Sequence, residues 1–121
     1  MKLSAARVFV RQIEEAKDFY LMLGLKLQSF DPEQGFCIFD TGDTKLIIES
    51  VPESAPQDDQ ALVGRFTGLS FPVADIVQAH KSMVEKGVKF SGNPEEQLWG
   101  GWLATFFDLE NNEIQLVQEV T

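Results

Sequence analysis

The stretch from Trp99 to Ile114 reads WGGWLATFFDLENNEI, and the interpretation of the whole chain starts from it. Residues 102–108 are rich in aromatic side chains and residues 113–119 alternate between polar and apolar ones, so two strands are predicted. The Leu-Glu-Asn-Asn between them is typical of a turn. Along the second strand, Ile114 and Leu116 fall on one face, which we expect to pack under a helix, and Gln115 falls on the other.

A faint internal repeat relates this half of the chain to the half before it. A shift of 63 positions brings Gly24 onto Gly87 without a gap in the surrounding residues. Each half then predicts the order β-α-β-β-β, with first strands at residues 5–10 and 69–73. The two glycines follow the predicted helices, at the position that favours a left-handed conformation.

One helix is predicted in each half. Apolar residues recur at helical spacing over residues 13–23 and again over residues 76–84. Asp75 is a suitable N-cap for the second helix, and Gln78 three residues later completes a capping-box pattern. Gln12 is a poorer cap, so the start of the first helix is less well marked.

The first half contains its own hairpin, with strands predicted at residues 35–40 and 45–50. A turn that is symmetrical about Gly42 and Asp43 pairs Phe36 with Glu49. One face of this pair is then wholly apolar and should pack under the helix; it carries Cys37, Phe39, Leu46 and Ile48. The other face is mixed and carries Phe36, Ile38, Asp40, Lys45, Ile47 and Glu49. Such a mixed face must be exposed or curl around something, and two such sheets side by side would form a trough.

These patterns predict the fold class α+β: two β-α-β-β-β modules forming a curved, cup-like mixed sheet with helices on its outer face. We expect a single domain over residues 1–121, because half of the chain would bury too little surface to be secure alone. The modules are placed at about residues 1–50 and 67–121. The segment 51–66 contains two prolines and the pair Asp58-Asp59, and is predicted to be a linker.

The composition argues against several classes of function. The 121 residues include 10 Lys and Arg against 19 Asp and Glu, and this net charge of −9 argues against nucleic acid and anionic membranes as partners. We expect no membrane span and no secretory signal, because no apolar run of roughly 20 residues and no cleavage pattern is visible. The single cysteine, Cys37, excludes an internal disulfide and favours the cytoplasm. The acidic charge permits a cationic ligand.

Taken together, the chain resembles the vicinal oxygen chelate superfamily, the fold of glyoxalase I, bleomycin resistance proteins and extradiol dioxygenases. The resemblance covers nearly the whole chain. It rests on Phe19-Tyr20, Leu23-Gly24-Leu25, Val73-Ala-Asp75-Ile76, Gly87-Val88 and, above all, the stretch from Trp99 to Ile114. That stretch is similar to the family's W-G…F-x-D-P-x-G-N-x-I ending. It departs from the family at Leu109 and Asn112, although Asn also tolerates the left-handed conformation of a turn.

The resemblance also implies where a metal would bind. In metal-dependent members, the first and last strands of each half supply four ligands, and these positions correspond to Ala5, Glu49, Gly68 and Gln115. Glu49 is a good ligand and Gln115 a weak one, whereas Ala5 and Gly68 have no side-chain donor. Because divalent cations need several oxygen or imidazole ligands, we expect neither a metal nor any other cofactor.

Aromatic and acidic residues are the candidates for a ligand site. Trp102, Ala104 and Phe106 share one face of their strand; if that face lines the trough, they join the aromatic residues of the first half in an apolar lining. The residues predicted to bind a ligand are Phe9, Phe36, Ile38, Ile47, Glu49, Trp102, Phe106 and Gln115. Alternatively, Trp99 and Trp102 plug the core or form a dimer contact, and Glu49 pairs with Lys45 or a neighbouring strand.

Two residues with reactive side chains are given structural roles. His80, the only histidine, is placed at the edge of the core on the second helix, and Cys37 is placed in the apolar face as a small filler. Neither a Ser-His-Asp set nor a Gly-rich phosphate loop can be assembled from the sequence. No catalytic residue is therefore predicted.

The leading hypothesis is metal-independent binding or sequestration of a small aromatic or cationic organic molecule, as the resemblance to antibiotic-resistance proteins of the bleomycin type implies. The alternative is an enzyme, a glyoxalase-type lyase, isomerase or dioxygenase, in which Glu49 is the base or the sole strong ligand of a site completed by a partner or substrate. A third hypothesis is a protein-interaction module. A homodimer is expected, because members of the family commonly dimerise.

Overall fold

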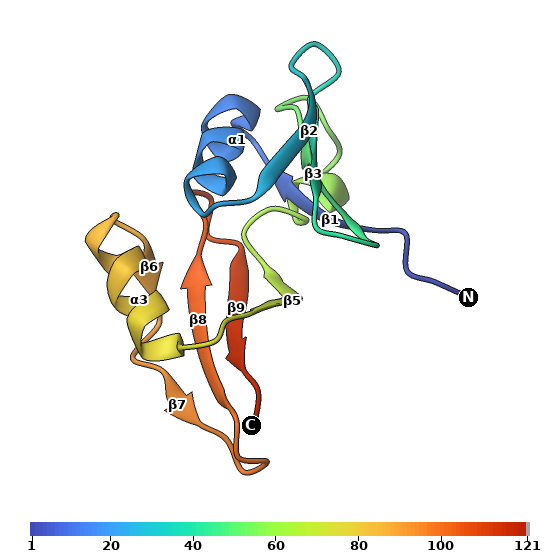
Figure 1. Ribbon diagram of the computed structural model, residues 1–121. Helices are drawn as coiled ribbons and strands as arrows, with labels where there is room; N and C mark the ends of the chain where they lie inside the picture. Colours follow the sequence, from blue (N-terminus) through green and yellow to red (C-terminus); the bar gives the residue numbers. More distant parts are fainter. Residues whose placement is uncertain (121) are drawn as a thin grey trace. The chain divides into compact units, whose positions relative to one another are not determined.

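The computed structural model describes residues 1–120, which form two compact units (Figure 1). The first unit comprises Met1–Arg65 and Leu109–Asn112, and the second comprises Phe66–Asp108 and the segment that begins at Glu113. Each unit contains an open mixed sheet and one helix of ten residues, which confirms the predicted α+β class. The segment 51–66, predicted as a linker, belongs to the first unit as far as Arg65.

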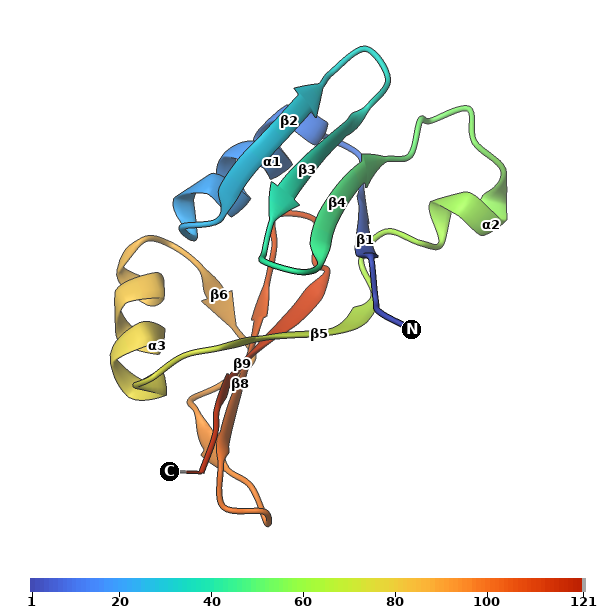
Figure 2. The same ribbon diagram turned by 45° about the vertical axis from the view of Figure 1, so that its right-hand side comes forward.

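The first unit has a four-stranded sheet of order β1-β4-β3-β2, in which β1 is parallel to β4 and the other neighbours are antiparallel (Figure 2). Its elements are β1 (Ala5–Val10), α1 (Ile13–Met22), β2 (Lys26–Asp31), β3 (Phe36–Asp40), β4 (Lys45–Ser50) and the short helix α2 (Gln57–Gln60).

The second unit repeats this topology with the order β5-β9-β8-β6, in which β5 is parallel to β9. Its elements are β5 (Phe66–Pro72), α3 (Ile76–Glu85), β6 (Lys89–Phe90), β7 (Glu95–Glu96), β8 (Trp102–Phe107) and β9 (Glu113–Gln118). The equivalence of the two strand orders confirms the predicted repeat. The short elements α2 and β7, which pairs with β8, were not predicted. Among residues 1–120, no helix is both long enough and apolar enough to cross a bilayer.

The two long helices end in the same way. At the end of α1, the N–H of Leu25 donates to the C=O of Tyr20 (3.3 Å), and the N–H of Gly24 donates to the C=O of Leu21 (3.0 Å). The equivalent two bonds end α3, around Gly87. This arrangement is the Schellman motif, which needs a left-handed residue after the helix. Gly24 and Gly87 supply it with φ of 99° and 91°, as their alignment in the repeat predicts.

The helix starts differ in the way that the sequence indicates. The carboxylate of Asp75 accepts the N–H of Gln78 (3.1 Å), which confirms the predicted N-cap of α3. Gln12 makes no side-chain cap at α1. Instead, the carboxylate of Glu110 accepts the N–H groups of Arg11 (2.6 Å) and Gln12 (2.7 Å). A negative charge at this position also interacts favourably with the helix dipole.

The core of the first unit lies between its sheet and α1. The predicted hairpin register is confirmed, with Phe36 opposite Glu49 and Cys37 opposite Ile48. Phe39 is fully buried, and its ring centroid lies 6.1 Å from that of Tyr20 on α1. The apolar face of the hairpin is buried as a whole and consists of Cys37, Phe39, Leu46 and Ile48.

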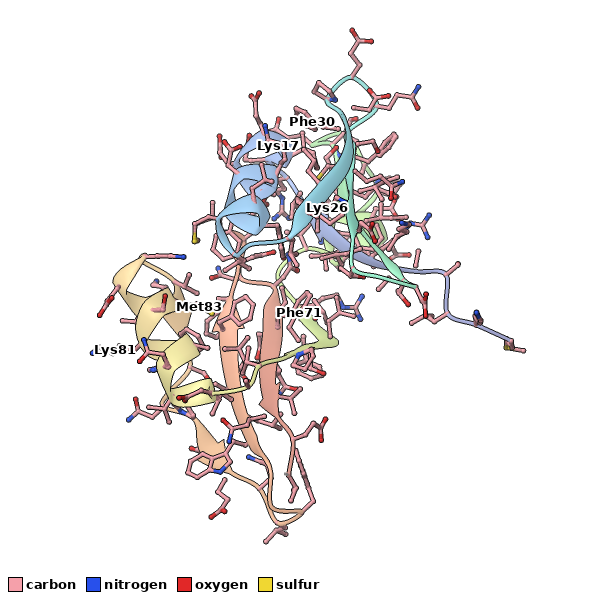
Figure 3. The ribbon with its side chains drawn as sticks, in the orientation of Figure 1. Lys17, Lys26, Phe30, Phe71, Lys81 and Met83 are labelled. Carbon is pink, nitrogen blue, oxygen red and sulfur yellow. The ribbon has the colours of Figure 1, made fainter. Side chains whose placement is uncertain are left out.

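Lys17 covers the edge of this core. Its Nζ lies 4.5 Å from the centroid of the Phe30 ring, and Figure 3 shows the two side chains next to each other, on α1 and β2. The Lys17 side chain is only 17% exposed, and its Nζ also lies 3.2 Å from Oδ1 of Asp18. The cation–π contact therefore places the aliphatic stem of Lys17 on apolar surface while its charge remains paired.

The turn between β8 and β9 enters the first unit through Asn112. This residue is fully buried; its Nδ2 donates to the C=O of Phe9 (2.9 Å), and its Oδ1 accepts the N–H groups of Gly64 (2.9 Å) and Arg65 (3.3 Å). The left-handed turn residue is Asn111, with φ of 66°. The left-handed conformation considered for Asn112 is therefore found at Asn111 instead. Asn112 is a buried anchor, because its side-chain amide satisfies three backbone groups.

We expect Asn112→Ala to destabilise the protein by about 3 kcal/mol, because it leaves buried backbone groups without their partner, each at a cost of roughly 1–3 kcal/mol. The measurement is urea unfolding, with the midpoint shifted and the slope unchanged. The matched control is Asn111→Gly, which suits the left-handed backbone and should change stability by less than about 0.5 kcal/mol. Equal effects of the two substitutions would contradict the anchoring role of Asn112.

Candidate functional site

Five of the predicted site residues lie on one face of the first sheet, opposite the face that packs against α1. The register places Phe9 of β1 and Phe36 of β3 on either side of Glu49, and it pairs Ile38 with Ile47. All five residues are partly exposed, whereas the residues between them in the strands are buried. Parity along the hairpin therefore predicted this face correctly.

The prediction for Trp102 and Phe106 was wrong about the face. Trp102 and Phe106 lie on the same face of β8 as Ala104. The register pairs Phe106 with Ile114 and Ala104 with Leu116. Phe106 is 1% exposed, and its ring centroid lies 5.8 Å from that of Phe90. These residues share the face that α3 covers, so Trp102 and Phe106 pack on the helix side of the second sheet instead of the opposite face.

Trp99, in contrast, does not plug the core. Its ring packs over Gly101 and leaves no room for a Cβ there, yet the residue is 50% exposed. His80 lies where the sequence places it, at the edge of the core, with its ring centroid 4.4 Å from that of Phe90. Cys37 is fully buried on the apolar face, and burial raises the pKa of its thiol to about 11. A thiol with this pKa is a poor nucleophile at neutral pH, in agreement with a packing role.

Gln115 lies on the opposite face of the second sheet, away from α3. Its Nε2 donates to Oγ1 of Thr105 (3.4 Å), its partner in the register. Both residues line a cavity of about 260 Å³ within the second unit. The lining is dominated by hydroxyl and amide groups and consists of Ser91, Gly92, Asn93, Glu95, Gln97, Leu103, Ala104, Thr105 and Gln115.

A second cavity lies within the first unit and combines acidic with apolar groups. Its volume is about 180 Å³. Two of its lining residues, Phe9 and Glu49, were predicted to bind a ligand. Of the others, Ser50 ends β4, and the rest come from the segment after β4, which was predicted to be a linker. The lining consists of Phe9, Glu49, Ser50, Val51, Pro52, Ala55, Asp59 and Leu62.

Glu49 forms an ion pair with the neighbouring strand. Nε of Arg7 lies 3.4 Å from Oε1 of Glu49, and the two side chains are 55% and 44% exposed. This is one of the alternatives that the sequence left open, and the partner is Arg7, not Lys45. Lys45 pairs instead with Asp40 (3.5 Å). An exposed pair of this kind contributes about 0–1 kcal/mol, so a ligand can replace either partner at small cost.

Asp40 closes the hairpin turn on the same face. The pKa of its carboxyl group lies below the ordinary value, because the N–H of Gly42 donates to Oδ1 (3.0 Å) and Lys45 lies beside it. Gly42 has φ of 103°, as a two-residue turn with glycine at its first position requires. Asp40 is therefore committed to the turn and does not line the cavity.

The four positions that would hold a metal by resemblance do not offer the donors that a metal site needs. Ala5 and Gly68 supply no donor, Glu49 is paired with a guanidinium group, and Gln115 is bonded to Thr105. Within residues 1–120, no three His, Cys, Asp or Glu side chains form a group that could hold an ion. The cationic Arg7, two residues from Ala5 and on the same side of β1, further opposes a divalent cation.

Comparison with known proteins agrees with the fold described above. The profile of the Glyoxalase/Bleomycin resistance protein/Dioxygenase superfamily matches residues 2–116. The chain belongs to this superfamily. The solved structure of a superfamily member from Sphaerobacter thermophilus is 30% identical, has a TM-score of 0.81, and the match covers 98% of each chain.

Two further relatives are similar over almost their whole length. TnmS3, an antibiotic binding protein from a Streptomyces species, is 27% identical, with a TM-score of 0.78 and coverage of 99% of this chain and 97% of that one. The protein YraH of Bacillus subtilis strain 168 is 29% identical over an alignment of 124 positions, which covers 96% of this chain and 97% of YraH. The superfamily therefore includes a member that binds an antibiotic.

The assignment of faces in the second unit is tested by two matched substitutions of phenylalanine. We expect Phe106→Ala to destabilise the protein by about 3–5 kcal/mol, because it leaves a cavity under α3. Phe36→Ala removes a partly exposed ring from the opposite face of the first sheet and should cost only about 1 kcal/mol. Urea unfolding measures both losses. A small loss for Phe106→Ala would contradict its position in the core.

Proposed function

We propose that this protein binds and sequesters a small organic molecule that carries an aromatic or cationic group, without a metal ion. The observation that supports the proposal most directly is the cavity of the first unit, where the aromatic ring of Phe9 and the carboxylate of Glu49 lie on the same lining. Small-molecule sites commonly combine apolar walls with a few polar groups that fix orientation.

The proposal agrees with the superfamily and with the composition of the chain. TnmS3, at 27% identity, is an antibiotic binding protein, so the fold is used for binding. The net charge of −9 favours the approach of a cation. The donor set at the metal positions does not favour an enzyme that depends on a divalent ion, because two of the four residues have no donor.

A thermal-shift screen against aromatic and cationic small molecules tests this function. A ligand at about 100 times its Kd should stabilise the protein by about 2.7 kcal/mol, which raises Tm by several degrees. We expect Phe9→Ala to remove most of this shift. The control is Phe36→Ala, on the same face but outside the cavity lining, which should retain the shift. Equal loss in both variants would contradict the cavity as the binding site.

Metal analysis separates binding from the enzymatic alternative. We expect the purified protein to contain far less than one equivalent of divalent metal, and we expect a chelator to leave Tm unchanged. Metal analysis by mass spectrometry measures the first quantity and thermal unfolding the second. One tightly held equivalent of zinc, nickel or iron would overturn the proposal of metal-independent binding.

We also propose that the protein is a cytoplasmic homodimer. Large apolar side chains of the second unit are exposed, including Leu98, Trp99 and Val120, and a second copy could cover them. The buried, unpaired Cys37 suits a reducing compartment. Light scattering coupled to size-exclusion chromatography should give twice the mass of 13.6 kDa, and a monomer at all concentrations would contradict the dimer.

A further inference from the structure

The segment 51–62, which forms one wall of the first-unit cavity, is held in place by hydrogen bonds and is not a loose linker. Val51 is buried, and its N–H donates to the C=O of Val10 (2.8 Å) at the end of β1. Further along, Nε2 of Gln60 donates to the C=O groups of Pro52 (2.7 Å), Glu53 (3.2 Å) and Ala55 (3.4 Å). These bonds hold the segment 51–62 in one conformation, so the side chains that it presents to the cavity are positioned before any ligand arrives.

This wall brings a second carboxylate to the cavity. Asp59 of α2 lines the same space as Glu49, although the two residues lie on different elements. Within the described part of the chain, no Lys or Arg forms an ion pair with Asp59. The adjacent Asp58 has the same charge but does not line the cavity. Asp59 therefore brings an exposed carboxylate to the lining of the cavity.

The residues that line the cavity carry two negative charges and no positive one. Glu49 and Asp59 each contribute −1, and the cations beside the lining are Arg7, which is paired with Glu49, and Arg11, whose Nη2 donates to the C=O of Gln60 (3.4 Å). Phe9 and Leu62 supply apolar surface beside these groups. A volume of about 180 Å³ corresponds to roughly six water molecules, which is enough for one aromatic ring with a short chain.

We propose that this cavity selects an organic monocation: an amine that binds between Glu49 and Asp59, attached to a single apolar ring that contacts Phe9 and Leu62. The inference rests on the proposed function and names the charge and size of its ligand. Arg7 competes with the amine for Glu49, and Asp59 determines the preference for a cation over a neutral molecule of the same shape.

Two probes of nearly equal shape test the selection by charge. Phenethylamine carries one positive charge at neutral pH, and 2-phenylethanol is its neutral counterpart. We expect the amine to bind about tenfold more tightly, since a charge-assisted contact is stronger than a neutral one. The Kd of each probe is measured from shifts of backbone amide signals of residues 49–62 in NMR titrations of the full chain.

Three variants identify the groups responsible. Asp59→Asn should weaken phenethylamine about fivefold to tenfold and leave 2-phenylethanol unchanged, because only the charge is removed. Asp58→Asn removes the same charge from the same helix and should change the Kd by less than about twofold. Arg7→Gln removes the competing cation and should strengthen the binding of the amine by about twofold to fivefold.

Two results would overturn the inference. In the first, both probes bind equally, or Asp59→Asn and Asp58→Asn have the same effect; the cavity then binds aromatic molecules without selecting charge, and the proposed function stands. In the second, neither probe shifts the signals of residues 49–62. The thermal-shift screen then decides the proposed function separately, because it uses other ligands and the Phe9→Ala variant.

Discussion

The buried amide of Asn112 is the interaction on which the first unit depends. One side chain joins the backbone of β1, at Phe9, to the backbone of the segment that returns from α2, at Gly64 and Arg65. A parallel bridge between Phe9 and Val63 lies at the same place. Because Phe9 also lines the cavity, the residue that satisfies the backbone of this strand also fixes one wall of the candidate site. Asn112 therefore stabilises both the packing of β1 and the position of Phe9 in the cavity lining.

The features that local chemistry determines could be predicted from the sequence. A symmetrical turn at Gly42 and Asp43 allows only one register of the hairpin, and the period of two along a strand then assigns every side chain to a face. Glycine after a helix has a specific backbone role, so the alignment of Gly24 with Gly87 predicted two equivalent helix ends. The topology of both units follows from these signals.

Other features depend on long-range packing, which one sequence does not reveal. Parity showed that Trp102 and Phe106 share a face, but it cannot say which face a helix covers. The ring of Phe90, beside Phe106, decides that because it also contacts His80 of α3. The segment 51–65 lacks hydrophobic periodicity, so it resembled a linker. Its order comes from hydrogen bonds that the side chain of Gln60 donates to the carbonyl groups of Pro52, Glu53 and Ala55, earlier in the same segment. The wall of the cavity was missed for this reason.

Cys37 has a practical consequence of a different kind. It is the only thiol in the chain, it is fully buried, and its pKa is raised to about 11. A cysteine introduced on the surface would therefore be the sole reactive sulfur in the native protein. Fluorophores or spin labels can be attached at one chosen point without first removing the natural residue, so distances between labelled copies become directly accessible to spectroscopy.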